Sequence, residues 1–175
     1  MTPTPTPTPT PTRKAFTDTR MFKVMRTLVG AANPFMTRLL DSRFGGRAAQ
    51  ALLLLEFRGR TSGKTFRTPV GYVRSGDRLV IVTSPTYRWW RNVVGGAPVQ
   101  VRLPEGWRDG QARVLMPDDP AYDSAVATQV AKRGPGMLRG FGVDVDDAGR
   151  IDPATKATAP THAHIVEILL VPSVR

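Results

Sequence analysis

A short segment rich in glycine, hydroxyl and cationic residues is the part of the chain best suited to chemistry. It runs from Gly59 to Pro69, in the order Gly-Arg-Thr-Ser-Gly-Lys-Thr-Phe-Arg-Thr-Pro, between apolar runs at 51–57 and 69–73. Such a segment offers backbone N–H groups, hydroxyl donors and fixed positive charge to a phosphate or a carboxylate. The sequence therefore predicts a strand, an anion-binding loop and a second strand.

The nucleotide P-loop, G-x-x-x-x-G-K-[ST], is the known motif nearest to this segment. Three residues, instead of four, separate Gly59 from Gly63, and the alternation after Pro69 indicates a strand where a P-loop begins a helix. These two differences argue against an NTPase. A surface hairpin with solvated charges is the alternative interpretation of the segment.

A second polar and aromatic segment follows the apolar run at 79–82. It reads Thr-Ser-Pro-Thr-Tyr-Arg-Trp-Trp-Arg-Asn-Val over residues 83–93, and Trp89 and Asn92 share a face if this segment is helical. A tryptophan beside a hydrogen-bonding amide suits an aromatic ligand. The alternative is one tryptophan in the core and one at its rim, with Asn92 capping a turn.

Other kinds of catalytic or metal chemistry find little support. His162 and His164 lie near several aspartates, but two histidines near the start of a strand are usually surface residues, so no metal site is predicted. The sequence has no G-x-S-x-G elbow and no G-x-G-x-x-G after a strand. It also has no cysteine, which excludes disulfides and a thiolate nucleophile.

Short apolar runs separated by turn residues predict strands from residue 51 onward. A single long helix is expected after Pro117, ending at Gly134. This pattern predicts a mainly β (α+β) fold, a six-stranded antiparallel barrel with N-terminal helices and one inserted helix. The strands are expected at 51–57, 67–74, 78–84, 98–103, 111–116 and 165–171, and the inserted helix at 119–132.

Three units are expected along the chain. Residues 1–16 are dominated by a Thr-Pro repeat and predict a disordered tail, because proline at every second position removes backbone donors and fixes φ. Residues 17–44 carry two helical patterns, of which the one at 17–29 is amphipathic with a basic face. Residues 45–175 are expected to form the barrel domain.

Positive charge is concentrated in the first part of the chain. The formal net charge is +11, and residues 1–75 hold 13 Lys and Arg against 3 Asp and Glu. This excess favours an anionic partner, although arginine-rich usage of a high-GC genome also explains it. No apolar run approaches the roughly 20 residues of a membrane span. A cytoplasmic protein is therefore expected, with peripheral membrane contact through residues 17–29 as the alternative.

The order of these motifs resembles the deazaflavin-dependent nitroreductase family, split β-barrel proteins that use coenzyme F420. The resemblance covers residues 33–116. The shared positions are Gly59 to Lys64, Arg67, Pro69-Val70, Gly76-Asp77, Ser84, Trp89-x-x-Asn92 and Pro98 to Val101.

The resemblance implies a role for each matching residue. Ser84 is a candidate catalytic residue, and Trp89 and Asn92 would close the site. The tyrosines that some members place in a C-terminal region have no matching position here; Tyr87 and Tyr122 are the only candidates, and Tyr87 is taken as the second catalytic candidate. Pro69, Ser84 and Pro85 would line the deazaflavin ring. The phosphate and tail of the cofactor would lie at Gly59, Arg60, Thr61, Ser62, Lys64 and Arg67. The segment between Ser84 and Trp89 is shorter here than in the quinone- and nitroimidazole-reducing members.

We therefore predict an F420-dependent oxidoreductase, a monomer or homodimer, acting on a small electron-poor acceptor such as a quinone, an enone or a nitroaromatic. Water or Ser84 would supply the proton. One alternative is a protein that binds F420 or a flavin such as FMN without turnover. A basic nucleic-acid-binding barrel is less well supported, because Trp and Arg alternate in one segment only.

Overall fold

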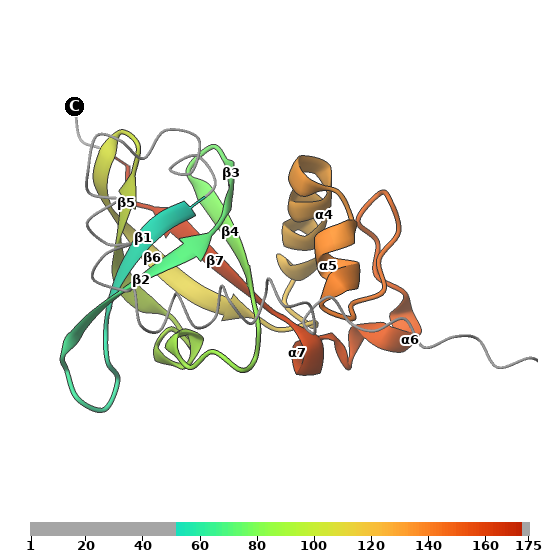
Figure 1. Ribbon diagram of the computed structural model, residues 1–175, viewed down its shortest axis with the longest axis horizontal. Coiled ribbons are helices and arrows are strands. Elements are labelled where there is room, and N and C mark those ends of the chain that lie inside the picture. Colours follow the sequence, from blue (N-terminus) through green and yellow to red (C-terminus); the bar gives the residue numbers. More distant parts are fainter. Residues whose placement is uncertain (1–51, 173–175) are drawn as a thin grey trace, which may run out of the picture.

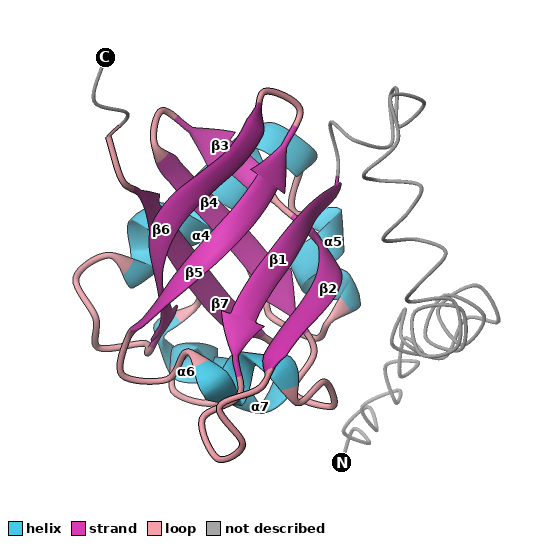
Figure 2. Cartoon of the chain, turned by 90° about the vertical axis from the view of Figure 1, so that its left-hand side faces the viewer, coloured by secondary structure: helices cyan, strands magenta, loops and turns pink. Residues whose placement is uncertain are grey.

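The computed structural model describes residues 52–172. Within this range, seven antiparallel strands form one curled sheet, a barrel that is split between its two edge strands (Figures 1 and 2). The strand order is β2-β1-β5-β6-β7-β4-β3. The strands are β1 (Leu52–Arg58), β2 (Thr65–Gly71), β3 (Val73–Ser75), β4 (Arg78–Thr83), β5 (Ala97–Leu103), β6 (Gly106–Leu115) and β7 (His164–Leu170). The predicted mainly β class is confirmed.

The prediction of six strands was wrong by one. The single strand expected at 67–74 is two strands, β2 and β3, which Tyr72 alone separates. Strand β2 pairs with β1, whereas β3 pairs with β4 at the opposite edge of the sheet. The alternation of side chains continues through Tyr72, so the sequence pattern gives no sign that the chain changes partners there.

Strand β6 begins earlier than expected, at Gly106 instead of residue 111. Its first residues are mostly polar, and Leu103 pairs with Gly106 across a tight turn. Gly106 has a φ of 131°, a conformation that side chains disfavour, so glycine suits this turn.

Five helices accompany the sheet in residues 52–172. They are η2 (Trp89–Asn92), which is a 3₁₀ helix, α4 (Tyr122–Arg133), α5 (Gly136–Gly140), α6 (Pro153–Lys156) and α7 (Ala159–His162). The helix predicted at 119–132 corresponds to α4, and the region that follows it holds three further short helices. Helices α4 and α5 lie to one side of the barrel (Figure 1). None of these helices is both long and apolar enough to cross a lipid bilayer.

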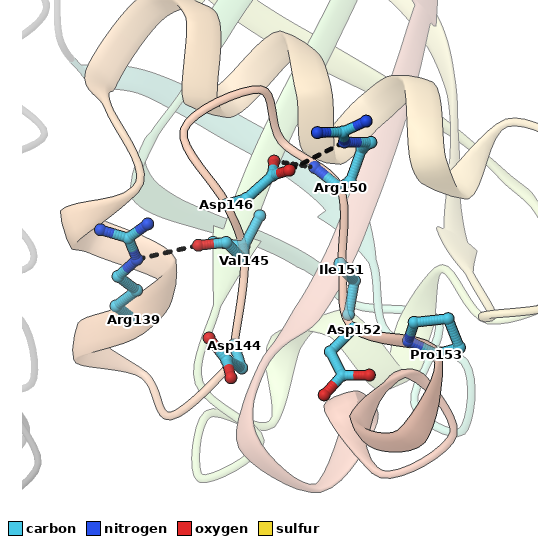
Figure 3. A pocket seen from close by; sticks show the side chains of 8 residues that line it. All are labelled: Arg139, Asp144, Val145, Asp146, Arg150, Ile151, Asp152 and Pro153. Carbon is cyan, nitrogen blue, oxygen red and sulfur yellow. Dashed lines mark hydrogen bonds and ion pairs between the residues drawn. The ribbon is translucent and has the colours of Figure 1, made fainter.

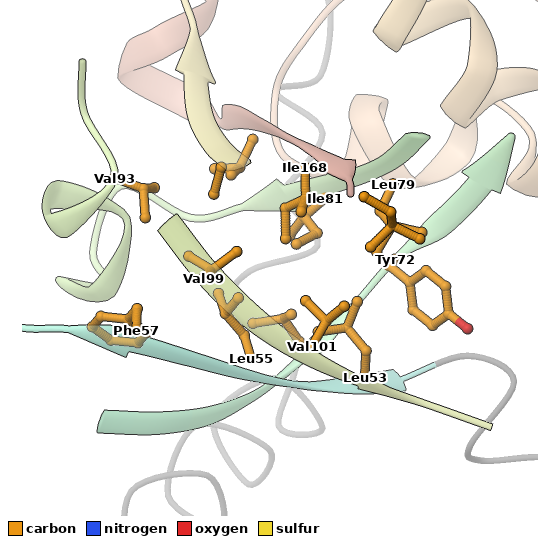
Figure 4. Packing of buried hydrophobic residues seen from close by; sticks show 14 of the residues in the cluster. Leu53, Leu55, Phe57, Tyr72, Leu79, Ile81, Val93, Val99, Val101 and Ile168 are labelled. Atoms are coloured by element: carbon orange, nitrogen blue, oxygen red, sulfur yellow. The ribbon is translucent and has the colours of Figure 1, made fainter. Parts of the chain in front are cut away.

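The alternation of side chains along the strands gives the barrel its interior. In β1, Leu53, Leu55 and Phe57 point inward and are buried, while Glu56 between them lies on the outer face. Matching residues of the other strands complete the core, as the convergence of Val99, Val101 and Ile168 in Figure 4 shows.

A second core joins α4 to the outer face of the sheet. Val80 of β4 and Ile165 of β7 pack there against Tyr122 and Val126 of the helix. Glu167 of β7 is also buried on this face, between two arginines. Its carboxylate accepts from Arg78 Nε at 2.5 Å and from Arg113 Nε at 2.8 Å.

Arg78 also reaches the start of α4. Its guanidinium donates to Ser124 Oγ and to the carbonyl of Ala121. The strand arginine and the buried carboxylate thus hold the first turn of the helix against the sheet.

The predicted tail at 1–16, the helices within 17–44 and the membrane contact at 17–29 lie outside the described residues, as do the boundaries that separate these units.

Candidate functional site

The glycine-rich loop closes the hairpin of β1 and β2, as the sequence predicts. Strand pairing ends at Arg58 and Thr65, which leaves residues 59–64 as the loop. Gly59 N–H donates to the carbonyl of Lys64 at 2.8 Å, and Gly63 N–H donates to the carbonyl of Gly59 at 2.8 Å. These bonds close the base of the loop, so its side chains, exposed to solvent from Arg60 to Lys64, project from one end of the barrel (Figure 1).

Gly59 packs closely against its neighbours. A Cβ atom there would lie 2.7 Å from Phe66 Cε2 and 2.7 Å from Ser62 Oγ, so both of these side chains would have to shift to admit it. Phe66 in turn stacks on Phe57, with ring centroids 5.9 Å apart. The base of the loop therefore lies against the ring of Phe66, which would have to move if residue 59 carried a side chain.

Helix η2 lies beside the loop and is joined to it by Asn92. Asn92 Oδ1 accepts from the backbone N–H of Arg60 at 3.0 Å, and its Nδ2 donates to the carbonyl of Trp89 at 2.9 Å. Trp89 packs against Phe57, with centroids 6.4 Å apart. The structure thus brings together the two segments that the sequence singled out.

Arg67 lies on edge strand β2 and faces the outside of the sheet. Its Nε donates to Glu56 Oε2 at 2.6 Å, and its guanidinium carbon lies 5.3 Å from the ring centre of Trp107. The guanidinium of Arg67 is therefore already paired with the Glu56 carboxylate, which partly neutralises its charge. Pro69, two residues further along, is buried, and its place on an edge strand fits a residue without an N–H donor.

Ser84 lies directly after β4 and is buried. Its Oγ shares a hydrogen bond of 2.8 Å with Thr86 Oγ1 and accepts from Thr86 N–H at 3.3 Å. The carbonyl of Ser84 accepts from Tyr87 N–H at 3.1 Å, so residues 84–87 form a turn, with Pro85 and Tyr87 half-buried. The hydroxyl proposed as a proton source thus already takes part in this turn.

A cluster that the sequence did not reveal lies at the same end of the barrel. His164, the first residue of β7, pairs with Thr83, the last residue of β4. Its ring centroid lies 3.8 Å from that of Trp90, and the Arg91 guanidinium lies 5.5 Å from the same tryptophan ring. Burial, and then the positive charge of Arg91, lower the pKa of His164.

The only hint of this cluster in the sequence was the adjacency of Trp90 and Arg91, because strand register decides which residue faces them.

The two histidines have different surroundings. His162 ends α7, exposed and near Gly142, whereas His164 is half-buried against Trp90. Within residues 52–172, no group of three His, Asp or Glu side chains could hold a metal ion.

A cleft of about 580 Å³ lies away from these segments, in the region between α5 and α6 (Figure 3). Asp146 in its wall closes a turn: it accepts from the N–H groups of Ala148 and Arg150 and pairs with Arg150 Nε at 2.8 Å. These bonds, above all those from Arg150, lower the pKa of Asp146. None of the residues that the sequence predicted to bind the cofactor lines this cleft.

Several solved structures resemble the chain. An F420-H2 dependent reductase shares 18% identity, with 68% of this chain and 94% of that chain covered and a TM-score of 0.47. The heme storage protein HutZ from Vibrio cholerae shares 11% identity, with 80% and 90% covered and a TM-score of 0.47. At TM-scores below 0.5, these likenesses carry no argument about function.

A third solved structure is a putative 5-nitroimidazole antibiotic resistance protein from Bacteroides thetaiotaomicron, at 11% identity. The match covers 71% of this chain and 76% of that chain, with a TM-score of 0.41. No curated protein matched the chain.

The family comparison is decisive. The model of the F420H(2)-dependent quinone reductase family matches residues 33–133, more than half of the chain. This range contains both the loop at 59–64 and helix η2. It confirms the resemblance seen in the sequence: the protein belongs to the F420H2-dependent quinone reductase family and is a reductase whose cofactor is F420.

Proposed function

We propose that the protein reduces a small electron-poor acceptor, a quinone, an enone or a nitroaromatic, at the end of the barrel where the 59–64 loop meets η2. Bound reduced F420 would supply the hydride. The observation that carries this proposal is the hydrogen bond of 3.0 Å between Asn92 and the backbone of Arg60, since it joins the two predicted halves of the site.

The donors of the loop suit the charged part of F420, which carries a phosphate and a glutamate tail. The exposed side chains include two cations, Arg60 and Lys64, and two hydroxyls, Thr61 and Ser62, with no acidic residue in residues 59–69. Charge-assisted donors of this kind bind phosphate and carboxylate groups strongly. In this proposal the loop binds the tail and fixes the direction in which the ring enters the site.

The surroundings of η2 suit the ring. Trp89 is half-buried on Phe57 and presents an aromatic surface, and the half-buried Pro85 in the turn before η2 adds apolar surface without a donor. Groups of this type bind a flat ring and exclude water from it. Pro69 pairs with Leu54 on the outer face of the sheet, the face opposite to Phe57, so it is not part of this surface. Because the Ser84 hydroxyl is already held in its turn, solvent is the simpler proton source for the reduced acceptor.

The experiment compares three cofactors and then a panel of acceptors. Quenching of tryptophan fluorescence on titration with F420, FMN and NADPH tests the choice of cofactor, and F420 alone is expected to bind tightly. Oxidation of reduced F420 is then followed with a quinone, an enone and a nitroaromatic. Tight F420 binding without turnover of any acceptor would identify a carrier, and binding of FMN in place of F420 would overturn the proposal.

A further inference from the structure

Both polar atoms of the Asn92 side chain form hydrogen bonds within the protein. Its oxygen accepts from Arg60 N–H, which comes from a loop 32 residues away, and its nitrogen donates to the carbonyl of Trp89 within η2. An amide is suited to such a bridge, since it carries a donor and an acceptor on one planar group. The family resemblance would instead place Asn92 against the cofactor.

The loop has a fixed backbone because most of its N–H groups have acceptors inside the protein. Those of Gly59 and Gly63 bind carbonyls within the loop, that of Lys64 lies 3.3 Å from Ser62 Oγ, and that of Arg60 binds Asn92. Among the described residues, no acceptor faces the N–H groups of Thr61 and Ser62 at the tip. The bond to Asn92 fixes the residue directly before these two donors.

We propose that Asn92 is a positioning residue, which holds the 59–64 loop in the shape that binds the phosphate of F420 and does not itself contact the ring. This inference rests on the proposed use of the loop for the cofactor tail. Donors held in place before binding need not lose conformational freedom when the ligand arrives, so holding them raises affinity. The gain in affinity is therefore expected for the phosphate and tail of F420, the part of the ligand that contacts the loop.

Aspartate is expected to fulfil only half of this role. Its carboxylate accepts from Arg60 N–H, but it has no donor for the Trp89 carbonyl. It also adds a negative charge beside the loop that carries Arg60 and Lys64. Asn92→Asp should therefore keep the loop in shape while it weakens the binding of an anion.

The decisive test uses two ligands, F420 and the deazaflavin riboside that lacks the phosphate and the glutamate tail. Asn92→Ala is expected to weaken F420 binding about three- to tenfold, the effect of one lost hydrogen bond, and to leave riboside binding unchanged. Gln100→Ala is the matched control, because it also removes an exposed side-chain amide, one that donates to Asp109 Oδ1 at 2.8 Å on the sheet. This variant should leave the affinities for both ligands unchanged. An equal loss for both ligands, or no loss for either, would overturn the proposal.

A measurement without cofactor separates this proposal from the proposed function. Amide hydrogen exchange at Arg60 should become faster in Asn92→Ala and stay near the wild-type rate in Asn92→Asp and Gln100→Ala. Unchanged exchange at Arg60 in Asn92→Ala would refute the positioning role even if F420 binds the wild type. If the wild type fails to bind F420, the proposed function is wrong, while the exchange experiment still tests the link between loop and helix.

Discussion

Arg60 presents two different groups to two different partners. Its backbone N–H donates to Asn92, while its side chain is exposed at the tip of the loop. A substitution that changes only the side chain therefore leaves the bond between loop and helix in place. The contribution of the guanidinium to anion binding can be measured separately from the shape of the loop.

Arg60→Ala is expected to weaken F420 binding by roughly tenfold, because a charge-assisted bond to phosphate is lost. Lys132→Ala removes an exposed cation from α4 and is the control for the change in net charge. Fluorescence titration measures both dissociation constants. Equal affinities for wild type and Arg60→Ala, with the thermal midpoint unchanged, would remove Arg60 from the binding site.

His164 gives the folded protein a specific dependence on pH. Burial and the nearby Arg91 lower its pKa in the folded state, so the unfolded chain binds a proton more readily. Stability from this residue is present above the unfolded pKa and is lost as the pH falls through the lower folded pKa. Arg91 is the charged group that opposes protonation of His164, whereas its neighbours Trp90 and Thr83 carry no charge.

The wild type is therefore expected to lose stability relative to His164→Asn as the pH falls from 8 to 5. Urea unfolding at several pH values measures the difference, and His162→Asn is the matched control for the loss of one histidine. If the stability difference between wild type and His164→Asn is the same at pH 8 and pH 5, the stated environment of His164 is wrong.

Helix α4 is attached to the sheet by more than apolar packing. Glu167 beneath it is almost fully buried and binds Arg78 and Arg113, and Arg78 continues to the first turn of the helix. Loss of the negative charge would leave Arg78 and Arg113 without the carboxylate that they share, while Arg113 keeps its pair with Asp119. Since Arg78 and Arg113 both retain contact with solvent, the cost should be smaller than for a completely buried pair.

Glu167→Gln is expected to lower the free energy of unfolding by about 2–3 kcal/mol, somewhat less than the loss of one partner from a buried pair. The exposed pair of Glu105 with Arg74 supplies the control, and Glu105→Gln should cost less than about 1 kcal/mol. Urea denaturation measures both variants. Equal losses would show that Glu167 is no more important than a surface carboxylate.

Local patterns in the sequence predicted most of the strands and the helix α4, because alternation and turn residues act over a few positions. They could not predict that the chain changes partners at Tyr72, since this depends on which edge of the sheet each strand joins. The same limit applies to the site. The two segments were recognisable, but the contacts of Asn92 with Arg60 and of His164 with Trp90 arise from folding.

The charge of the whole molecule should affect how F420 binds. The formal net charge is +11, and an anionic ligand is attracted over distances comparable to the Debye length, about 10 Å at 0.1 M salt. Attraction of this kind weakens as salt is added, whereas the packing of a flat ring on aromatic and proline side chains depends on salt much less.

F420 affinity is therefore expected to fall severalfold between about 20 mM and 200 mM salt, while the affinity for the riboside without phosphate and tail stays nearly constant. Titrations at four salt concentrations give the two slopes. Equal slopes would show that the tail does not bind through charge. A steep salt dependence of oligonucleotide binding would instead support the nucleic-acid-binding alternative.

Tyr72 has a mechanical consequence for the split in the barrel. Strands β2 and β3 share no ladder of hydrogen bonds, so the seam between them can widen by rotation about the two backbone torsions of Tyr72. Arg133, at the last turn of α4, donates from its guanidinium to the Tyr72 carbonyl at 2.7 Å. The residue at which the chain leaves one edge of the sheet for the other is thus tied to helix α4, so a change at the end of this helix is expected to reach the strand that follows the 59–64 loop.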